Sequence, residues 1–238
     1  MLQKIDVGYQ SSLLRPFEHV HHGFSSRKAG DMRHDAGNRK RFAGALGLGQ
    51  SPVFAQQTHG NTVPGDGLVS TTFPVAVVTA DCVPMLLVDP ESKVFGAIHA
   101  GWKGTLGGII VNAVRAMVQC GAAKQRIYAA IGPHIGACCY GVPEERAQVF
   151  IDRFGTDEKM AFQSDGKWHL DIGWANYRQL IEAGVLSDHI DAPPTCTSCQ
   201  NDEFFSYCKD SKETYGEMMA VIGLRSIVKK RFARRSAP

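Results

Sequence analysis

Three aliphatic segments follow one another almost without a break, and they restrict the fold more than any other feature of the sequence. Residues 74–80 (PVAVVTA), 84–89 (PMLLVD) and 94–100 (VFGAIHA) have the length and composition of buried strands. The links between them are too short for a crossover helix, so part of the sheet is expected to be antiparallel. Asp81 and Cys82 interrupt the run, although a buried strand does not need a carboxylate there.

Helical segments are interspersed with the strands. Spaced apolar residues and glycine stops predict helices at residues 38–48, 108–121, 143–155 and 174–184, and further strands at 127–132, 168–172 and 216–224. The strand–helix–strand unit at 94–131 can be parallel. We therefore expect an α/β (α+β) fold with mixed β-sheets packed between helices. We expect residues 1–238 to form a single domain that ends in a basic, solvated tail at about residues 229–238.

The composition excludes several classes of protein. The chain has 238 residues, of which 44% are hydrophobic and 21% charged, as in ordinary globular proteins. A formal net charge of +3 is too small to indicate a nucleic-acid partner. No apolar run approaches the roughly 20 residues of a spanning helix, and the N-terminus lacks an export signal. Seven cysteines without such a signal indicate reduced thiols, so we expect a soluble cytoplasmic protein without a membrane partner.

Three residues have side chains suited to a metal site. His59 lies between polar turn residues in AQQTHGNTV, Cys82 follows an aliphatic strand, and His99 lies at the carboxyl end of another, just before a glycine loop. Two imidazoles and one thiolate are good zinc ligands, and three protein ligands leave a fourth position open for water. The residue types alone also fit a turn histidine, a satisfied core histidine and a small buried thiol.

Longer motifs resemble a known family. QTHGNTV, TADCVPMLLVDP, GAIHAGWKGTLGGII and AAIGPHIGACCYGV, in this order, resemble the YfiH/laccase-domain family, whose members carry the names polyphenol oxidase, purine nucleoside phosphorylase and peptidoglycan editing factor. The resemblance covers almost the whole chain and implies a four-layer α/β/β/α arrangement. It also implies that His59, Cys82 and His99 are the metal ligands, with Zn²⁺ as the expected ion and copper as the alternative.

The family resemblance implies purine nucleoside chemistry. We expect phosphorolysis of adenosine, inosine or methylthioadenosine, with adenosine deaminase side activity, by a monomer or homodimer. Phosphorolysis requires an anion site, for which Arg27 in HGFSSR and Lys103 in the glycine-rich loop 101–108 are the candidates; tight packing is the alternative role for the glycines. Asp81 points away from Cys82 on a regular strand, so we expect it to fix the turn or orient a ligand histidine, with general base as the alternative.

Two rival activities remain open. A copper-dependent polyphenol oxidase requires many histidines in H-x-H pairs, whereas this chain has nine histidines and a single such pair, at His19 and His21. A thiol hydrolase or amidase acting on peptidoglycan precursors would use Cys82 as nucleophile and His99 as base. A thiolate cannot be a metal ligand and a nucleophile at once, so metal content distinguishes the two.

The remaining cysteines and three departures from the family pattern complete the sequence analysis. Cys196 and Cys199 form a C-x-x-C, but the sequence has no second one, so we expect a loop feature rather than a Cys₄ zinc site, and we assign no chemistry to Cys138 and Cys139. Gly141 stands where the family usually has glutamate. The chain is also shorter than the family pattern after Arg27 and after Val63.

Overall fold

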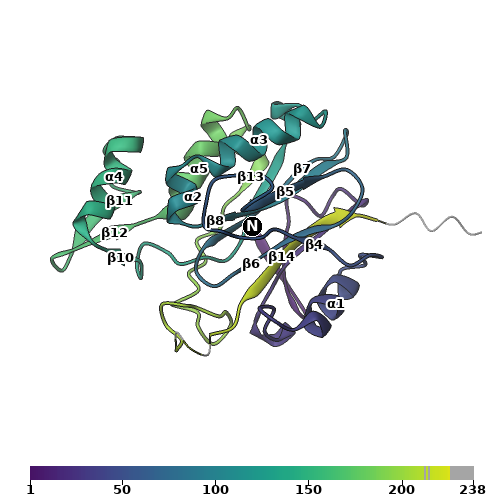
Figure 1. The fold of residues 1–238 in the computed structure, drawn as a ribbon, viewed down its shortest axis with the longest axis horizontal. Helices are drawn as coiled ribbons and strands as arrows, with labels where there is room; N and C mark the ends of the chain where they lie inside the picture. Colours follow the sequence, from purple (N-terminus) through teal and green to yellow (C-terminus); the bar gives the residue numbers. More distant parts are fainter. Residues whose placement is uncertain (212, 214, 226–238) are drawn as a thin grey trace, which may run out of the picture.

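The structure is a computed structural model that describes residues 1–211, 213 and 215–225. Within these residues, two mixed β-sheets pack face to face at the centre (Figure 1). The five-stranded sheet has the order β13-β9-β7-β8-β5, formed by Ile190–Asp191, Tyr128–Ile131, Val83–Asp89, Val94–Ala100 and Gly67–Ser70. The expected basic tail at about residues 229–238 lies outside the described residues.

The second sheet is six-stranded in the described part of the chain. Its order is β1-β2-β3-β14-β6-β4, formed by Leu2–Ile5, Gly8–Ser11, Val20–Ser25, Met218–Leu224, Val75–Thr79 and Val53–Phe54. Beside these two sheets lies a small antiparallel sheet, β10-β12-β11, formed by Gly141–Val142, Lys167–Leu170 and Ala161–Ser164. The helix α4 (Glu144–Phe154) accompanies it at the left of Figure 1.

Helices cover the outer faces of both central sheets. The five-stranded sheet packs against α3 (Ile109–Gln119) and α5 (Ile172–Glu182), preceded by the short α2 (Trp102–Leu106). The six-stranded sheet packs against α1 (Ala36–Ala45). The expected four-layer α/β/β/α arrangement is therefore confirmed (Figure 1). No helix among the described residues is long and apolar enough to cross a membrane.

The layered core explains why the strands read as continuous apolar sequence. On β7, Met85 and Leu87 pack with the helices, whereas Leu86 and Val88 pack between the two sheets. Successive side chains of a strand point to opposite faces, so a strand buried on both faces needs apolar residues at every position. All seven residues of β7 are buried.

The three aliphatic segments become β6, β7 and β8, but they do not share one sheet. β6 belongs to the six-stranded sheet, whereas β7 and β8 form an antiparallel pair in the other, with Val83 opposite Ala100. The chain therefore passes from one sheet to the other around Asp81 and Cys82. β8 and β9 both run antiparallel to β7 and are thus parallel to each other, as the strand–helix–strand unit predicts.

Candidate metal centre

The structure brings the three sequence-predicted ligands together. Cys82 directly precedes β7, His99 is the penultimate residue of β8, and His59 lies in the loop between β4 and β5. Their ligand atoms all lie within 4.8 Å of one another, and the two imidazole rings meet edge to face with centroids 4.8 Å apart. His99 is buried, Cys82 half-buried and His59 exposed, so the group opens to solvent on the His59 side. These three residues are called the triad below.

The backbone that presents the triad adopts an unusual conformation. Gln57, His59 and Asp81 have φ angles of 55°, 59° and 83°, in the left-handed region that residues with a side chain rarely occupy. Such conformations persist where the surrounding structure enforces them, and they cluster at functional sites. Both loops that carry an exposed or half-buried ligand are therefore held in a strained form.

A buried carboxylate that the sequence analysis missed orients one ligand. Asp66 is fully buried, and its Oδ1 lies 2.8 Å from Nδ1 of His99. The backbone N–H groups of His59 and Gly60 and the hydroxyl of Thr58 also donate to this carboxylate, at 2.7–2.9 Å. With Nδ1–H donated to Asp66, His99 presents Nε2 to an ion, which is the usual support of a metal-bound histidine.

Electrostatic coupling within the triad favours a thiolate. Burial alone would raise the pKa of Cys82, but hydrogen bonds and charge from His59 and His99 lower it to about 7. Burial alone would lower the pKa of His99, yet Asp66 and Cys82 raise it to about 9. Burial also opposes ionisation of Asp66, but its donors hold its pKa well below the usual range. The deprotonated thiol is the form that binds a metal ion.

The space between the ligands also fits an ion. A Cβ added at Gly101 would lie 3.3 Å from Cys82 Sγ and 3.4 Å from Cδ2 of His59, so glycine keeps room beside both ligands. A Cβ at Gly104 would lie 2.5 Å from the carbonyl oxygen of Gly60. These glycines thus bring α2 against the loop that carries His59. The glycine-rich stretch does not lead into one long helix, as a phosphate-binding loop would, because Trp102–Leu106 is a separate five-residue helix. Close packing therefore explains its glycines.

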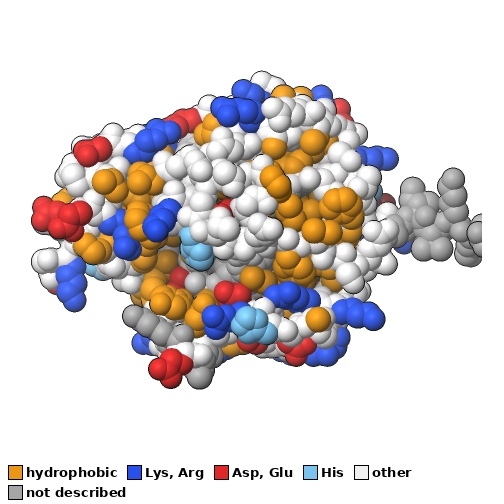
Figure 2. Space-filling model, viewed as in Figure 1, with side chains coloured by type: hydrophobic (Ala, Val, Ile, Leu, Met, Phe, Trp, Pro, Cys, Tyr) orange, Lys and Arg blue, Asp and Glu red, His pale blue; other side chains and the backbone are white. Residues whose placement is uncertain are grey.

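Two cavities adjoin the triad. The larger, of about 720 Å³, is bordered by His59 and Cys82 and has a largely apolar and aromatic wall that includes Trp102, Tyr140 and Ile172. The smaller, of about 390 Å³, is bordered by all three triad residues and by Tyr207, Tyr215 and Glu217. Figure 2 shows histidine and charged side chains gathered at a hollow near the middle of the drawn face.

Neither of the two predicted phosphate ligands borders these cavities. Arg27 donates to the carboxylate of Asp210 at 2.6 Å and to the carbonyl of Asn201 at 2.6 Å, and its guanidinium lies 4.3 Å from the ring centroid of Phe205. Lys103 is exposed, with its Nζ 5.5 Å from the Trp102 ring centroid. Arg27 thus ties down the 201–210 loop, and Lys103 faces solvent on α2.

Other basic residues line the larger cavity instead. Arg146, on α4, donates to the hydroxyl of Tyr140 at 3.2 Å, and its guanidinium lies 4.4 Å from the ring centroid of Trp102. Lys167, at the start of β12, lines the same cavity. Sequence reasoning could not select these two residues, because both come from the small side sheet and its helix, away from the triad in the chain.

Asp81 fixes loops around the triad. Its carboxylate accepts a hydrogen bond from the hydroxyl of Thr197 at 2.6 Å and from the backbone N–H of Cys208 at 2.7 Å. Its carbonyl accepts the N–H of Ile135 at 3.0 Å. The expected turn-fixing role matches these contacts, whereas the role of orienting a ligand histidine falls to Asp66.

The smaller cavity contains a carboxyl group with a raised pKa. Glu217 is half-buried, and burial followed by the charge of Asp31 raises its pKa, against the opposing charges of Arg33 and His99. A carboxyl that remains protonated nearer to neutral pH can donate a proton to a bound molecule. Glu217 precedes β14 in a segment without a recognisable motif, so sequence reasoning had no basis for selecting it.

Four further cysteines form a second group. Cys138 and Cys139 lie beside Cys196 and Cys199, and their ligand atoms are all within 4.8 Å of one another. The sequence analysis did not anticipate this grouping, because adjacent cysteines from a distant loop, rather than a second C-x-x-C, lie beside Cys196 and Cys199.

Comparison with known proteins agrees with the fold. Residues 14–225 match the family described as multi-copper polyphenol oxidoreductase laccase. The chain belongs to this laccase-domain family. A crystal structure of a laccase-domain protein, YlmD from Geobacillus stearothermophilus, superposes with a TM-score of 0.83 at 29% identity and covers 94% of this chain and 99% of its own.

Curated relatives within the laccase-domain family carry the names of nucleoside enzymes. A protein of Deinococcus radiodurans named purine nucleoside phosphorylase is 41% identical over 210 residues, which cover 83% of this chain and 80% of the relative. A protein named adenosine deaminase RL5, from an unknown prokaryotic organism, is 37% identical over 134 residues, or 56% of this chain and 51% of the relative.

The laccase name itself finds little support in the arrangement of histidines. Among the described residues, which include all nine histidines, the potential metal-binding groups are the triad and the four-cysteine cluster. A trinuclear copper cluster requires several histidines around one point, and neither group supplies them.

Proposed function

We propose that this chain is a metal-dependent purine nucleoside phosphorylase that acts on adenosine, inosine or methylthioadenosine, with adenosine deaminase side activity. The observation that carries the proposal is the position of the triad. Two of its members, His59 and Cys82, border a cavity of about 720 Å³ that has an aromatic wall and two basic side chains, and all three members border the smaller cavity. Relatives named purine nucleoside phosphorylase give this site its substrate class.

Zinc is the ion that we propose for the triad. His59, Cys82 and His99 offer the mixed nitrogen and sulfur set that Zn²⁺ prefers, and copper is the alternative. When bound, zinc supplies a Lewis acid and lowers the pKa of water in its open position. Asp66 keeps the His99 ring oriented, and Gly101 keeps the space between the ligands free.

The two cavities suggest how the substrates lie. Phosphate is a dianion near neutral pH, so we place it in the larger cavity beside Arg146 and Lys167, in place of Arg27 and Lys103. We place the purine toward the smaller cavity, where Glu217 is the carboxyl group with a raised pKa. The ribose then spans the space at the triad, between the incoming phosphate and the departing base.

Glu217 has a defined task in this arrangement. When the bond between ribose and purine breaks, the purine leaves with a pair of electrons and is stabilised by a proton. A protonated Glu217 donates that proton, while the phosphate oxygen forms the new bond to the anomeric carbon. Asp81 is a positioning residue in this proposal, because its carboxylate is bound to Thr197 and Cys208.

Product analysis tests the proposal directly. Protein of measured metal content is incubated with adenosine and with inosine, with and without phosphate, and the products are separated by chromatography. Adenine plus ribose-1-phosphate, formed only when phosphate is present, is the expected result. Inosine formed from adenosine without phosphate demonstrates the deaminase activity. Neither product, with oxidation of a phenol instead, would overturn the proposal.

A thiol hydrolase is the second candidate, and one observation favours it. Asp66 is hydrogen-bonded to the imidazole of His99, and the thiol of Cys82 lies within 4.8 Å of that ring, which is the order of groups in a cysteine nucleophile with an oriented base. Amide bonds of peptidoglycan precursors would be its substrates. Amide hydrolysis that persists after zinc is removed would establish this candidate, whereas stoichiometric zinc bound through Cys82 excludes it.

The cellular setting is part of the proposal. The structure forms no disulfide among the seven cysteines, all of which lie in described positions. Reduced thiols at two metal-binding groups favour a reducing compartment, so we propose a cytoplasmic monomer or homodimer.

A further inference from the structure

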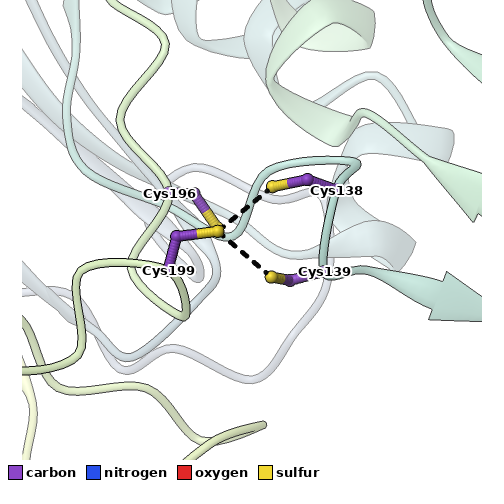
Figure 3. A group of neighbouring side chains, drawn as sticks. All are labelled: Cys138, Cys139, Cys196 and Cys199. Atoms are coloured by element: carbon purple, nitrogen blue, oxygen red, sulfur yellow. Dashed lines mark hydrogen bonds between the residues drawn. The ribbon is translucent and has the colours of Figure 1, made fainter.

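The four-cysteine cluster joins two loops that are far apart in sequence. Cys138 and Cys139 lie in a turn after β9, and Cys196 and Cys199 lie in the segment that follows β13. Figure 3 shows the side chains converging, with dashed lines from Cys199 to both cysteines of the other loop. A turn permits what a strand does not, since adjacent side chains on a strand point to opposite faces.

The sulfur atoms have the separations of a metal site. Cys199 Sγ lies 3.5 Å from Cys138 Sγ and 3.4 Å from Cys139 Sγ, and all four sulfurs lie within 4.8 Å of one another. A disulfide bond would require about 2.05 Å. Four thiolates at about 2.3 Å from a tetrahedral Zn²⁺ lie about 3.8 Å apart. The two contacts of Cys199 are a few tenths of an ångström shorter than that value, and no pair of sulfurs is more than 4.8 Å apart, so small side-chain adjustments suffice for the cluster to enclose an ion.

Backbone contacts hold the two loops in register. His134 forms an isolated parallel bridge with Cys196, and the N–H of Thr197 donates to the carbonyl of His134 at 2.9 Å. The N–H of Gly136 donates to Cys196 Sγ at 3.3 Å. A Cβ at Gly136 would lie 3.3 Å from the Cβ of Cys196 on the other loop, so the absence of a side chain there lets the loops approach. N–H donors to sulfur are typical support for a metal thiolate.

We propose that Cys138, Cys139, Cys196 and Cys199 bind a structural zinc ion, distinct from the metal of the triad. Four cysteine ligands complete a tetrahedral shell, so this ion has no position for substrate. Its task is to fasten the loop of residues 132–140 to the segment of residues 195–200. Cys139 and Tyr140 line the larger cavity, and Asp81 binds Thr197, so this fastening holds one wall of the cavity in place. The proposal does not depend on the purine chemistry.

Metal counting on full-length protein tests the site. Wild type and three variants are purified with zinc supplied, under reducing conditions and without chelators, and zinc per chain is measured by mass spectrometry. We expect two zinc ions in wild type, one in Cys199→Ser and one in Cys82→Ala. Cys120→Ser is the matched control, since Cys120 is exposed at the end of α3 and belongs to neither group, and it should keep two.

The zinc counts of the variants distinguish a failure of the four-cysteine proposal from a failure of the triad proposal. One zinc in wild type that disappears in Cys82→Ala but remains in Cys199→Ser would overturn the four-cysteine site and leave the triad intact. One zinc that disappears in Cys199→Ser but remains in Cys82→Ala would support the four-cysteine site and overturn the metal of the triad.

A second measurement does not require Cys199→Ser to fold. Metal-depleted Cys82→Ala protein is titrated with Co²⁺, whose absorption reports the number of thiolate ligands. We expect intense tetrahedral thiolate bands that saturate at one equivalent and bleach on addition of Zn²⁺. Weak octahedral absorption, or a disulfide from Cys199 to Cys138 or Cys139 in the freshly reduced protein, would overturn the proposal.

Discussion

The triad and the four-cysteine cluster border the same region of the molecule, but they are built differently. The triad combines two imidazoles with one thiol, and Asp66 orients one of its histidines. The cluster offers four thiols, which are in contact with a backbone N–H group and with one another. Three protein ligands leave an ion open to substrate, whereas four close it. The difference is the basis for proposing that the triad serves chemistry and that the cluster holds loops.

The triad and the four-cysteine cluster also differ in the elements that carry their ligands. Cys82 and His99 stand at the ends of two paired strands in the centre of the molecule, so their spacing is fixed by the β7–β8 register. The four cysteines stand on two loops that meet through one isolated bridge. A site on paired strands is positioned before the ion arrives, whereas loops gain order from the ion itself. Removing each ion should therefore have different consequences.

Loss of a ligand from each group gives the largest contrast. Cys82→Ala should abolish nucleoside turnover, because it removes the only sulfur ligand at the open site. Cys199→Ser should lower kcat/KM by several-fold at most, while lowering the melting temperature more than Cys82→Ala does. Steady-state kinetics and thermal unfolding of both variants provide the comparison. Full activity in Cys82→Ala would refute the assignment of the triad.

Replacing Asp66, which orients His99, should have the second-largest effect. Asp66→Asn weakens the acceptor that holds His99, so we expect a loss of about 10–100-fold in metal affinity or activity. Asp89→Asn is the matched control, because Asp89 is equally buried and binds the N–H of Ala123 and the guanidinium of Arg126 away from the triad. It should reduce stability but leave metal affinity unchanged. Equal losses of metal affinity in both variants would show that burial, not orientation, is responsible.

Thiol labelling as a function of pH distinguishes the two groups without any mutation. In metal-free protein, the lowered pKa of Cys82 makes it a thiolate above about pH 7, so its alkylation should rise through that pH. The raised pKa of Cys138 keeps that thiol protonated until more alkaline pH. Peptide-resolved mass spectrometry after brief alkylation measures both midpoints. A common midpoint would contradict the electrostatic contrast, and zinc should protect both residues.

Replacing Arg146, a basic residue of the larger cavity, should affect nucleoside turnover but not the four-cysteine cluster. Arg146→Ala removes a charge-assisted contact with phosphate, so we expect the KM for phosphate to rise by about 10-fold or more, with both zinc ions retained. Lys103→Ala is the control, since Lys103 is exposed on α2 outside the cavities. Its KM for phosphate should stay within twofold of wild type. A larger effect from Lys103 than from Arg146 would restore the expectation drawn from the sequence.

The sequence predicted the features that depend on local pattern or on motifs. The strands at residues 74–100 were located to within a residue, because their apolar runs end at polar or turn residues. The triad was selected from the positions of His59, Cys82 and His99 after strands or in a turn, with the family motifs as support. What the pattern could not show is that β6 and β7 lie in different sheets. The link at Asp81 looks like a short hairpin, and only tertiary packing decides otherwise.

Residues whose role comes from long-range contacts were missed. Asp66 lies in a turn-like stretch, VPGDGLV, and only its burial against His99 reveals its task. Arg27 has the charge of a phosphate ligand, but its partner is Asp210, nearly the whole chain away. Cys138 and Cys139 find Cys196 and Cys199 through the pairing of two loops about sixty residues apart. No local spacing encodes such contacts.

The absence of a side chain at Gly101 limits which substitutions this position can accept. It provides no atom to the ion, yet a single added methyl group would stand 3.3 Å from Cys82 Sγ and 3.4 Å from the ring of His59. If the triad binds an ion as proposed, a saturation-mutagenesis experiment should find this position as intolerant as a ligand, because alanine would occupy space beside both ligands. An inventory of donor atoms misses such a residue. The signature of the site includes the empty volume beside its ligands as well as the ligands themselves.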